Sequence, residues 1–64
     1  MVKFALLHDI NNPQHNKYID ATDFDAVEDF GTGSVVRLKS SDMPVAVHET
    51  PDEVKQIVED TLRS

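Results

Sequence analysis

A chain of 64 residues is long enough for one domain only, and we assign residues 1–64 to a single domain. A domain of this size buries barely enough apolar surface to offset its conformational entropy. Without cysteine it has no disulfide or zinc-thiolate site for reinforcement, so we expect a homo-oligomer. The 12 acidic and 6 basic residues give a net charge of −6, which disfavours direct binding to nucleic acid or to an anionic membrane.

The hydropathy pattern indicates a cytoplasmic protein. No apolar run approaches the length that spans a membrane, and the apolar stretch at the N-terminus is too short for the core of a signal peptide. The absence of cysteine also suits a reducing compartment. We therefore expect no membrane partner.

Two strands are predicted in the first third of the chain. Residues 2–8 alternate weakly and are apolar on both faces, which favours a strand that is covered on both sides. Residues 9–16 form a polar, turn-rich segment that Asn12 and Pro13 interrupt. Residues 17–21 predict a short second strand.

The segment that follows admits two interpretations. Phe24, Ala26 and Phe30 alternate with acidic residues, which predicts a third strand with these three side chains facing inward. Thr22 or Asp23 is equally placed to cap a helical turn over residues 23–28. The sequence leaves this choice open.

Residues 31–33 predict a hairpin connection, and two further strands follow it. Two glycines, Gly31 and Gly33, supply the backbone freedom of a tight connection. Residues 34–39 form the clearest strand, with Val36 and Leu38 inward and with Val35, Arg37 and Lys39 outward. Residues 43–48 predict the next strand, in which Met43, Val45 and Val47 share a face and Pro44 lies at an edge or at the start.

The C-terminal segment predicts an amphipathic helix. Thr50 is placed as its N-cap, Pro51 takes the first helical position, and Glu53 completes a capping box. The apolar residues of this helix share one face; they are Val54, Ile57, Val58 and Leu62. The fold class predicted is therefore α+β: a small antiparallel β-meander of four to five strands packed against one C-terminal amphipathic helix.

A family resemblance rests on the same residues. The strand Gly33-Ser-Val-Val-Arg-Leu-Lys, a short turn, and then Val45-Ala-Val-His-Glu-Thr-Pro-Asp-Glu-Val54 resemble the small FlbD-like proteins of flagellar operons and similar proteins of phages and prophages. The chain differs from the flagellar members by a longer polar segment over residues 11–17 and by the lack of a basic C-terminal tail. The resemblance thus favours a phage-encoded protein, and it implies no catalytic residue.

The sequence predicts no enzyme, no cofactor and no metal site. Its serines lack the glycine-framed context of a nucleophile, and its paired acidic residues fall in segments that are typically solvated. His8, His15 and His48 do not follow a known ligand spacing, even with Asp9 or Glu49 beside them.

Two sets of residues are candidates for binding. The predicted contacts to a ligand or partner are Tyr18, Arg37, Lys39 and His48. The predicted oligomer interface comprises Ala5, Leu7, Val35 and Ala46. Three functions follow: an oligomeric, non-enzymatic protein that binds and modulates a host protein, an oligomer that sequesters an anionic signalling nucleotide, and an acidic mimic of DNA.

Overall fold

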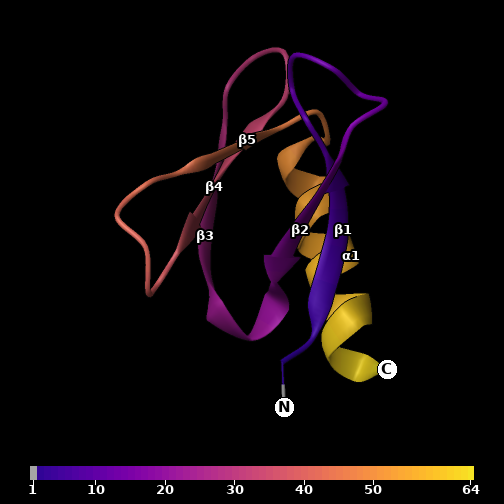
Figure 1. Ribbon diagram of the computed structural model, residues 1–64, viewed down its shortest axis with the longest axis vertical. Helices are drawn as coiled ribbons and strands as arrows, with labels where there is room; N and C mark the ends of the chain where they lie inside the picture. Colours follow the sequence, from indigo (N-terminus) through magenta and orange to yellow (C-terminus); the bar gives the residue numbers. More distant parts are fainter. Residues whose placement is uncertain (1) are drawn as a thin grey trace.

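Five strands, one short 3-10 turn and one α-helix make up the fold (Figure 1). The computed structural model describes residues 2–64. Its elements are, in chain order, β1 (Phe4–His8), β2 (Asn16–Asp20), η1 (Ala21–Asp23), β3 (Phe24–Asp29), β4 (Ser34–Leu38), β5 (Val45–Val47) and α1 (Pro51–Arg63). The predicted α+β class is confirmed, and the open choice over residues 23–28 is resolved in favour of a strand.

The strands form two antiparallel sheets. β1 pairs with β2, while β3, β4 and β5 form the second sheet in that order. A bridge between Asp9 and Val47 joins the end of β1 to the end of β5, and the N–H of His48 donates to the carbonyl of His8 at 2.8 Å. Helix α1 runs beside β1 and contacts both β1 and β3 (Figure 1), so it closes the gap between the two sheets.

The core lies between α1 and the inner faces of both sheets. Every element except β3 contributes at least one fully or almost fully buried apolar residue, and these residues are Ala5, Leu7, Ile19, Ala21, Val36, Val47, Val54 and Val58. Phe24, Val27, Leu38, Val45 and Ile57 pack against them and are partly buried. The inward orientation predicted for Val36, Leu38, Val45 and Val47 is therefore confirmed.

A bulge in β3 corrects the predicted alternation of that strand. The register with β4 shifts between Phe24 and Ala26, because Asp25 is an extra residue in the pairing. The bulge inverts the alternation, and Val27 rather than Ala26 packs on the core behind Phe24. Phe30 lies beyond the end of the strand and is 62% exposed, so its predicted inward orientation was wrong.

The connections before and after β4 have different constraints. Gly31 adopts a φ of +87°, which favours glycine, and a Cβ on Gly33 would overlap the carbonyl oxygen of Val47 in β5. β5 starts directly after Pro44, two residues later than the predicted start of this strand at Met43. Met43 was expected to share the inner face of β5 but is 77% exposed, because it belongs to the turn in which its N–H donates to Ser41 Oγ.

Helix α1 begins with the predicted capping box. Thr50 Oγ1 accepts from the N–H of Glu53 at 3.2 Å, and Glu53 Oε1 accepts from the N–H of Thr50 at 3.1 Å. At the other end, Lys3 Nζ donates to the carbonyl of Leu62 at 3.1 Å, which ties the helix to the segment before β1. Across residues 2–64, no helix combines the length and the apolar composition that a membrane crossing requires.

Candidate interaction surface

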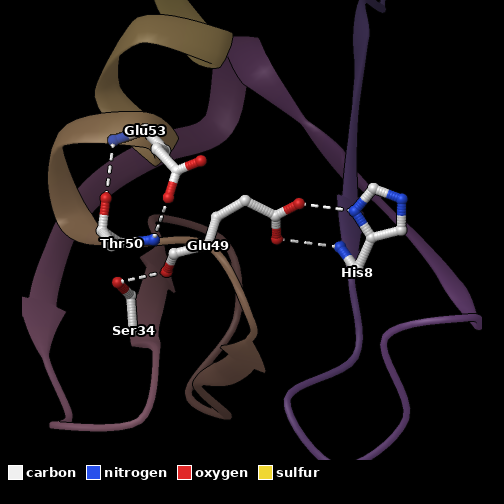
Figure 2. A network of polar contacts seen from close by, with 5 residues as sticks. All are labelled: His8, Ser34, Glu49, Thr50 and Glu53. Atoms are coloured by element: carbon white, nitrogen blue, oxygen red, sulfur yellow. Dashed lines mark hydrogen bonds and ion pairs between the residues drawn. The ribbon is translucent and has the colours of Figure 1, made fainter.

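Glu49 connects the two sheets next to the bridge between Asp9 and Val47. It follows β5 and precedes the N-cap of α1, and its carboxylate reaches across to β1 (Figure 2). Glu49 Oε1 accepts from the N–H of His8 at 3.0 Å, and Oε2 lies 2.5 Å from His8 Nδ1, which must carry the proton because a carboxylate only accepts. The Glu49 carbonyl accepts from the buried hydroxyl of Ser34 at 2.7 Å. Side-chain and main-chain groups of Glu49 therefore hold β1 and β4 together.

The ionisation of Glu49 is set by this environment. Burial by itself raises the pKa of Glu49, since only 9% of the residue is exposed. The hydrogen bonds from the His8 ring, from the His8 N–H and from its own backbone lower that pKa, as does the charge of a protonated His8. The hydrogen bonds outweigh burial, so the pKa lies below its ordinary value of 4.5 and Glu49 is an anion at neutral pH.

The outer face of the β1–β2 hairpin is apolar and uncovered. Leu6 is the cross-strand neighbour of Tyr18, and Phe4 lies diagonally from Tyr18 on the same face. Phe4 is 65% exposed, Tyr18 62% and Leu6 40%, whereas Ala5, Leu7 and Ile19 on the inner face of the same hairpin are buried. We call Phe4, Leu6 and Tyr18 the outer hairpin face.

One acidic residue, Asp20, borders the outer hairpin face at its end. Asp20 lies opposite Phe4, and its carboxylate accepts from the N–H of Thr22 at 2.9 Å and from the Thr22 hydroxyl at 2.6 Å. Lys17, which neighbours Tyr18 in sequence, has its ammonium group 3.8 Å from the Asp9 carboxylate. The outer hairpin face is thus a group of three exposed apolar residues on a chain with a net charge of −6.

The four residues predicted to contact a ligand lie in three different places. Tyr18 belongs to the outer hairpin face, while His48 lines a hollow of about 370 Å³ between the β3–β4 connection and the start of α1. Arg37 and Lys39 line a second hollow of about 260 Å³ next to the β4–β5 connection. The structure thus brings Arg37 and Lys39 together and separates them from Tyr18 and His48.

Neither hollow has the electrostatics of a strong anion site. Asp29, Glu49 and Glu53 line the first hollow, and the capping box already occupies the N–H groups of Thr50 and Glu53. The second hollow contains acidic as well as basic side chains, and Arg37 Nε donates to Glu28 at 3.0 Å. In both hollows acidic groups oppose the charge of an anionic ligand.

The residues predicted for an oligomer interface divide into two pairs. Val35 and Ala46 are direct cross-strand neighbours in the β4–β5 pairing, as expected, and both are half-buried. Ala5 and Leu7 are completely buried in the chain's own core, which corrects their assignment to an interface. The strand is apolar on both faces as predicted, but the face that remains available is that of Phe4 and Leu6.

Sequence reasoning overlooked the structural role of Glu49 and the exposure of Phe4 and Leu6. Glu49 and His8 are 41 positions apart, so no local pattern connects them. For β1 the alternation revealed two apolar faces and gave no sign of which face α1 covers. Within residues 2–64, no three histidine or acidic side chains gather in a geometry that could hold a metal ion.

Comparisons with known proteins leave these surfaces as the basis for function. No protein-family model, no curated protein and no solved structure matches the chain. The FlbD-like resemblance therefore stays a prediction from the residues of the C-terminal half. The outer hairpin face and the two hollows are therefore the basis for a functional proposal.

Proposed function

We propose that the chain is a non-enzymatic interaction protein that binds another protein through the outer hairpin face. The observation that carries the proposal is the exposure of Phe4, Leu6 and Tyr18 on one side of a hairpin whose other side contributes Ala5, Leu7 and Ile19 to the core. A chain of this size buries little apolar surface, so placing these side chains in its core would increase its stability. Keeping them in solvent is costly unless a partner covers them.

The chemistry of the partner follows from the charge of the chain. The chain has a net charge of −6, so a partner whose apolar patch has a basic rim approaches faster and fits better than an acidic one. Aromatic residues such as Phe4 and Tyr18 are the usual anchors in such an interface. If the chain comes from a phage, this partner is a host protein.

Site-specific photocrosslinking in the producing cell tests the proposal. A photoreactive phenylalanine analogue replaces Phe4 in one variant and Lys55, which is exposed on α1, in the control. We expect an adduct with one discrete protein from position 4 and none from position 55. Equal adducts from both positions, or no heterologous adduct from position 4, would contradict binding through this face.

A second candidate function is sequestration of a small anionic ligand such as a signalling nucleotide. Arg37 and Lys39 supply its cationic groups in the second hollow, and the acidic side chains of Asp25 and Asp42 beside them make it the weaker of the two candidates. Native mass spectrometry of the protein as purified shows whether a phosphate-bearing mass is retained. The Arg37→Glu variant should lose that mass, and its retention would refute the assignment.

A further inference from the structure

The alternation of hydrogen-bonded and non-hydrogen-bonded pairs in the β1–β2 hairpin identifies which backbone groups of β2 point away from β1. The N–H of Asp9 donates to His15 O at 3.0 Å, and the N–H of Ala21 donates to Lys3 O at 2.7 Å. These pairs mark the hydrogen-bonded positions of the ladder, and such positions alternate along an antiparallel pair. The intervening pair of Leu6 and Tyr18 is therefore not hydrogen-bonded within the hairpin.

The backbone hydrogen bonds of His8 in β1 independently confirm this alternation. The N–H of His8 donates to Glu49 and the carbonyl of His8 accepts from His48, both away from β2. On β2, the equivalent groups are the N–H and carbonyl of Asn16 and Tyr18. No other strand lies beside β2 in residues 2–64, so these groups form an open edge.

The two outer edges of the fold differ in their protection. The edge at β3 carries a bulge at Asp25 and the exposed acidic side chains of Glu28 and Asp29, which oppose pairing with another copy of the same strand. The edge at β2 carries the charged residues Lys17 and Asp20, but it is regular, contains no proline or bulge, and has the aromatic side chain of Tyr18 at its centre. The β2 edge therefore has fewer features that oppose edge-to-edge association than the β3 edge.

From this contrast we infer that two copies of the chain associate by antiparallel pairing of their β2 edges across a two-fold axis at Tyr18. In this register Tyr18 pairs with Tyr18 of the second copy and Asn16 lies opposite Asp20, so no like charges face each other. A shift of two residues in one direction places Lys17 opposite Lys17 of the second copy, and the opposite shift shortens the overlap. Like charges directly opposite each other destabilise a sheet, so the charges of β2 select one register.

The inference goes beyond the proposed function, although both use the same hairpin. Pairing of the β2 edges makes a four-stranded sheet in which the outer hairpin faces of both copies are continuous. The dimer then presents two outer hairpin faces side by side to another protein. This larger area is closer to the roughly 800 Å² that each side of a standard interface contributes. The dimer itself is tested with purified protein alone, so its failure is separate from failure to crosslink a heterologous protein.

Sedimentation equilibrium over about 1 to 300 μM tests the dimer and its register. We expect the mass to rise with concentration from 7.2 kDa toward twice that value. Asn16→Asp places two new pairs of like charges in the interface and should weaken the dimer about fivefold. Asn12→Asp makes the same charge change in the exposed loop and should alter the constant by less than twofold. A wild-type protein that stays monomeric throughout, or equal effects of the two variants, would overturn the inference.

A cysteine substitution supplies a positive test, because the chain has no cysteine of its own. Residues opposite each other in a hydrogen-bonded antiparallel pair have Cα atoms about 5.5 Å apart, within the range that a disulfide spans. Tyr18→Cys should therefore form a disulfide-linked dimer in a glutathione redox buffer at least tenfold more readily than Met43→Cys, which alters a more exposed turn residue. Equal dimer formation by the two variants would place the contact elsewhere.

Discussion

Replacing Glu49 by alanine removes the carboxylate that connects β1 to the segment before α1. The N–H of His8 then loses its acceptor, and the His8 ring loses an ionic partner at 2.5 Å. Hydrogen bonds to charged groups contribute about 1.5–3 kcal/mol, and leaving a buried donor without an acceptor adds a desolvation penalty. We expect Glu49→Ala to lower the free energy of unfolding by about 2–4 kcal/mol.

This loss is large for a domain of this size. A chain of 64 residues has a total stability of about 3–10 kcal/mol, and each kcal/mol corresponds to about 4–8 °C in the melting temperature. Thermal and urea unfolding followed by circular dichroism, at one fixed protein concentration, measure the effect. Glu59→Ala is the matched control, because Glu59 is exposed on α1 and its pair with Arg63 at 3.5 Å contributes only about 0.3–0.5 kcal/mol. Equal losses from the two substitutions would refute the role assigned to Glu49.

The pH dependence of the same pair gives a second measurement. Because the pKa of Glu49 is lowered in the folded state, the unfolded chain binds more protons as the pH falls through this range. The stabilisation from the Glu49 charge is therefore fully present above about pH 4.5 and is lost as the pH falls through the folded-state pKa. The difference in unfolding free energy between the wild type and Glu49→Gln should shrink as the pH falls below about 4.5, and a constant difference would contradict this assignment.

Four further substitutions probe the core and the connections. Leu7→Ala should cost about 2–5 kcal/mol because Leu7 is completely buried, whereas Leu6→Ala, on the outer hairpin face, should cost less than about 1 kcal/mol in urea unfolding. Gly33→Ala forces a Cβ against the backbone of β5 and should lower the melting temperature by about 10 °C or more. An unchanged melting temperature would mean that Gly33 and Val47 can move apart at little cost. Thr50→Ala removes the N-cap of α1 and should cost about 1 kcal/mol, which a loss of helical ellipticity at lower urea concentration would report.

The parts of the fold that were predicted correctly depend on neighbours in sequence. The capping box needs only Thr50 and Glu53, and the pairing of Val35 with Ala46 follows from a short hairpin. The alternation in β3 was misread because a bulge adds one residue to one strand, and nothing local marks Asp25 as that residue. Local chemistry thus determined the elements, whereas their irregularities depend on the strands beside them.

The candidate surface was harder to predict because it depends on what α1 covers. A strand with two apolar faces offers the helix a choice, and the sequence did not show that Ala5 and Leu7 would be buried while Phe4 and Leu6 would stay exposed. The smaller side chain of Ala5 offers a physical reason: it lets α1 approach the sheet closely, which Phe4 would prevent.

The structural roles of β1 also constrain how its binding role is measured. The strand contributes Leu7 to the core, His8 to the contact with Glu49, and Phe4 and Leu6 to the outer hairpin face. A substitution at His8 or Glu49 loosens the end of the hairpin, so it would weaken association indirectly even though neither residue belongs to the outer face. Only a change that leaves the unfolding free energy intact, such as Leu6→Ala, isolates the contribution of the face itself. If Leu6→Ala leaves binding unchanged while Glu49→Ala abolishes it, the hairpin supports the fold and the binding surface lies elsewhere.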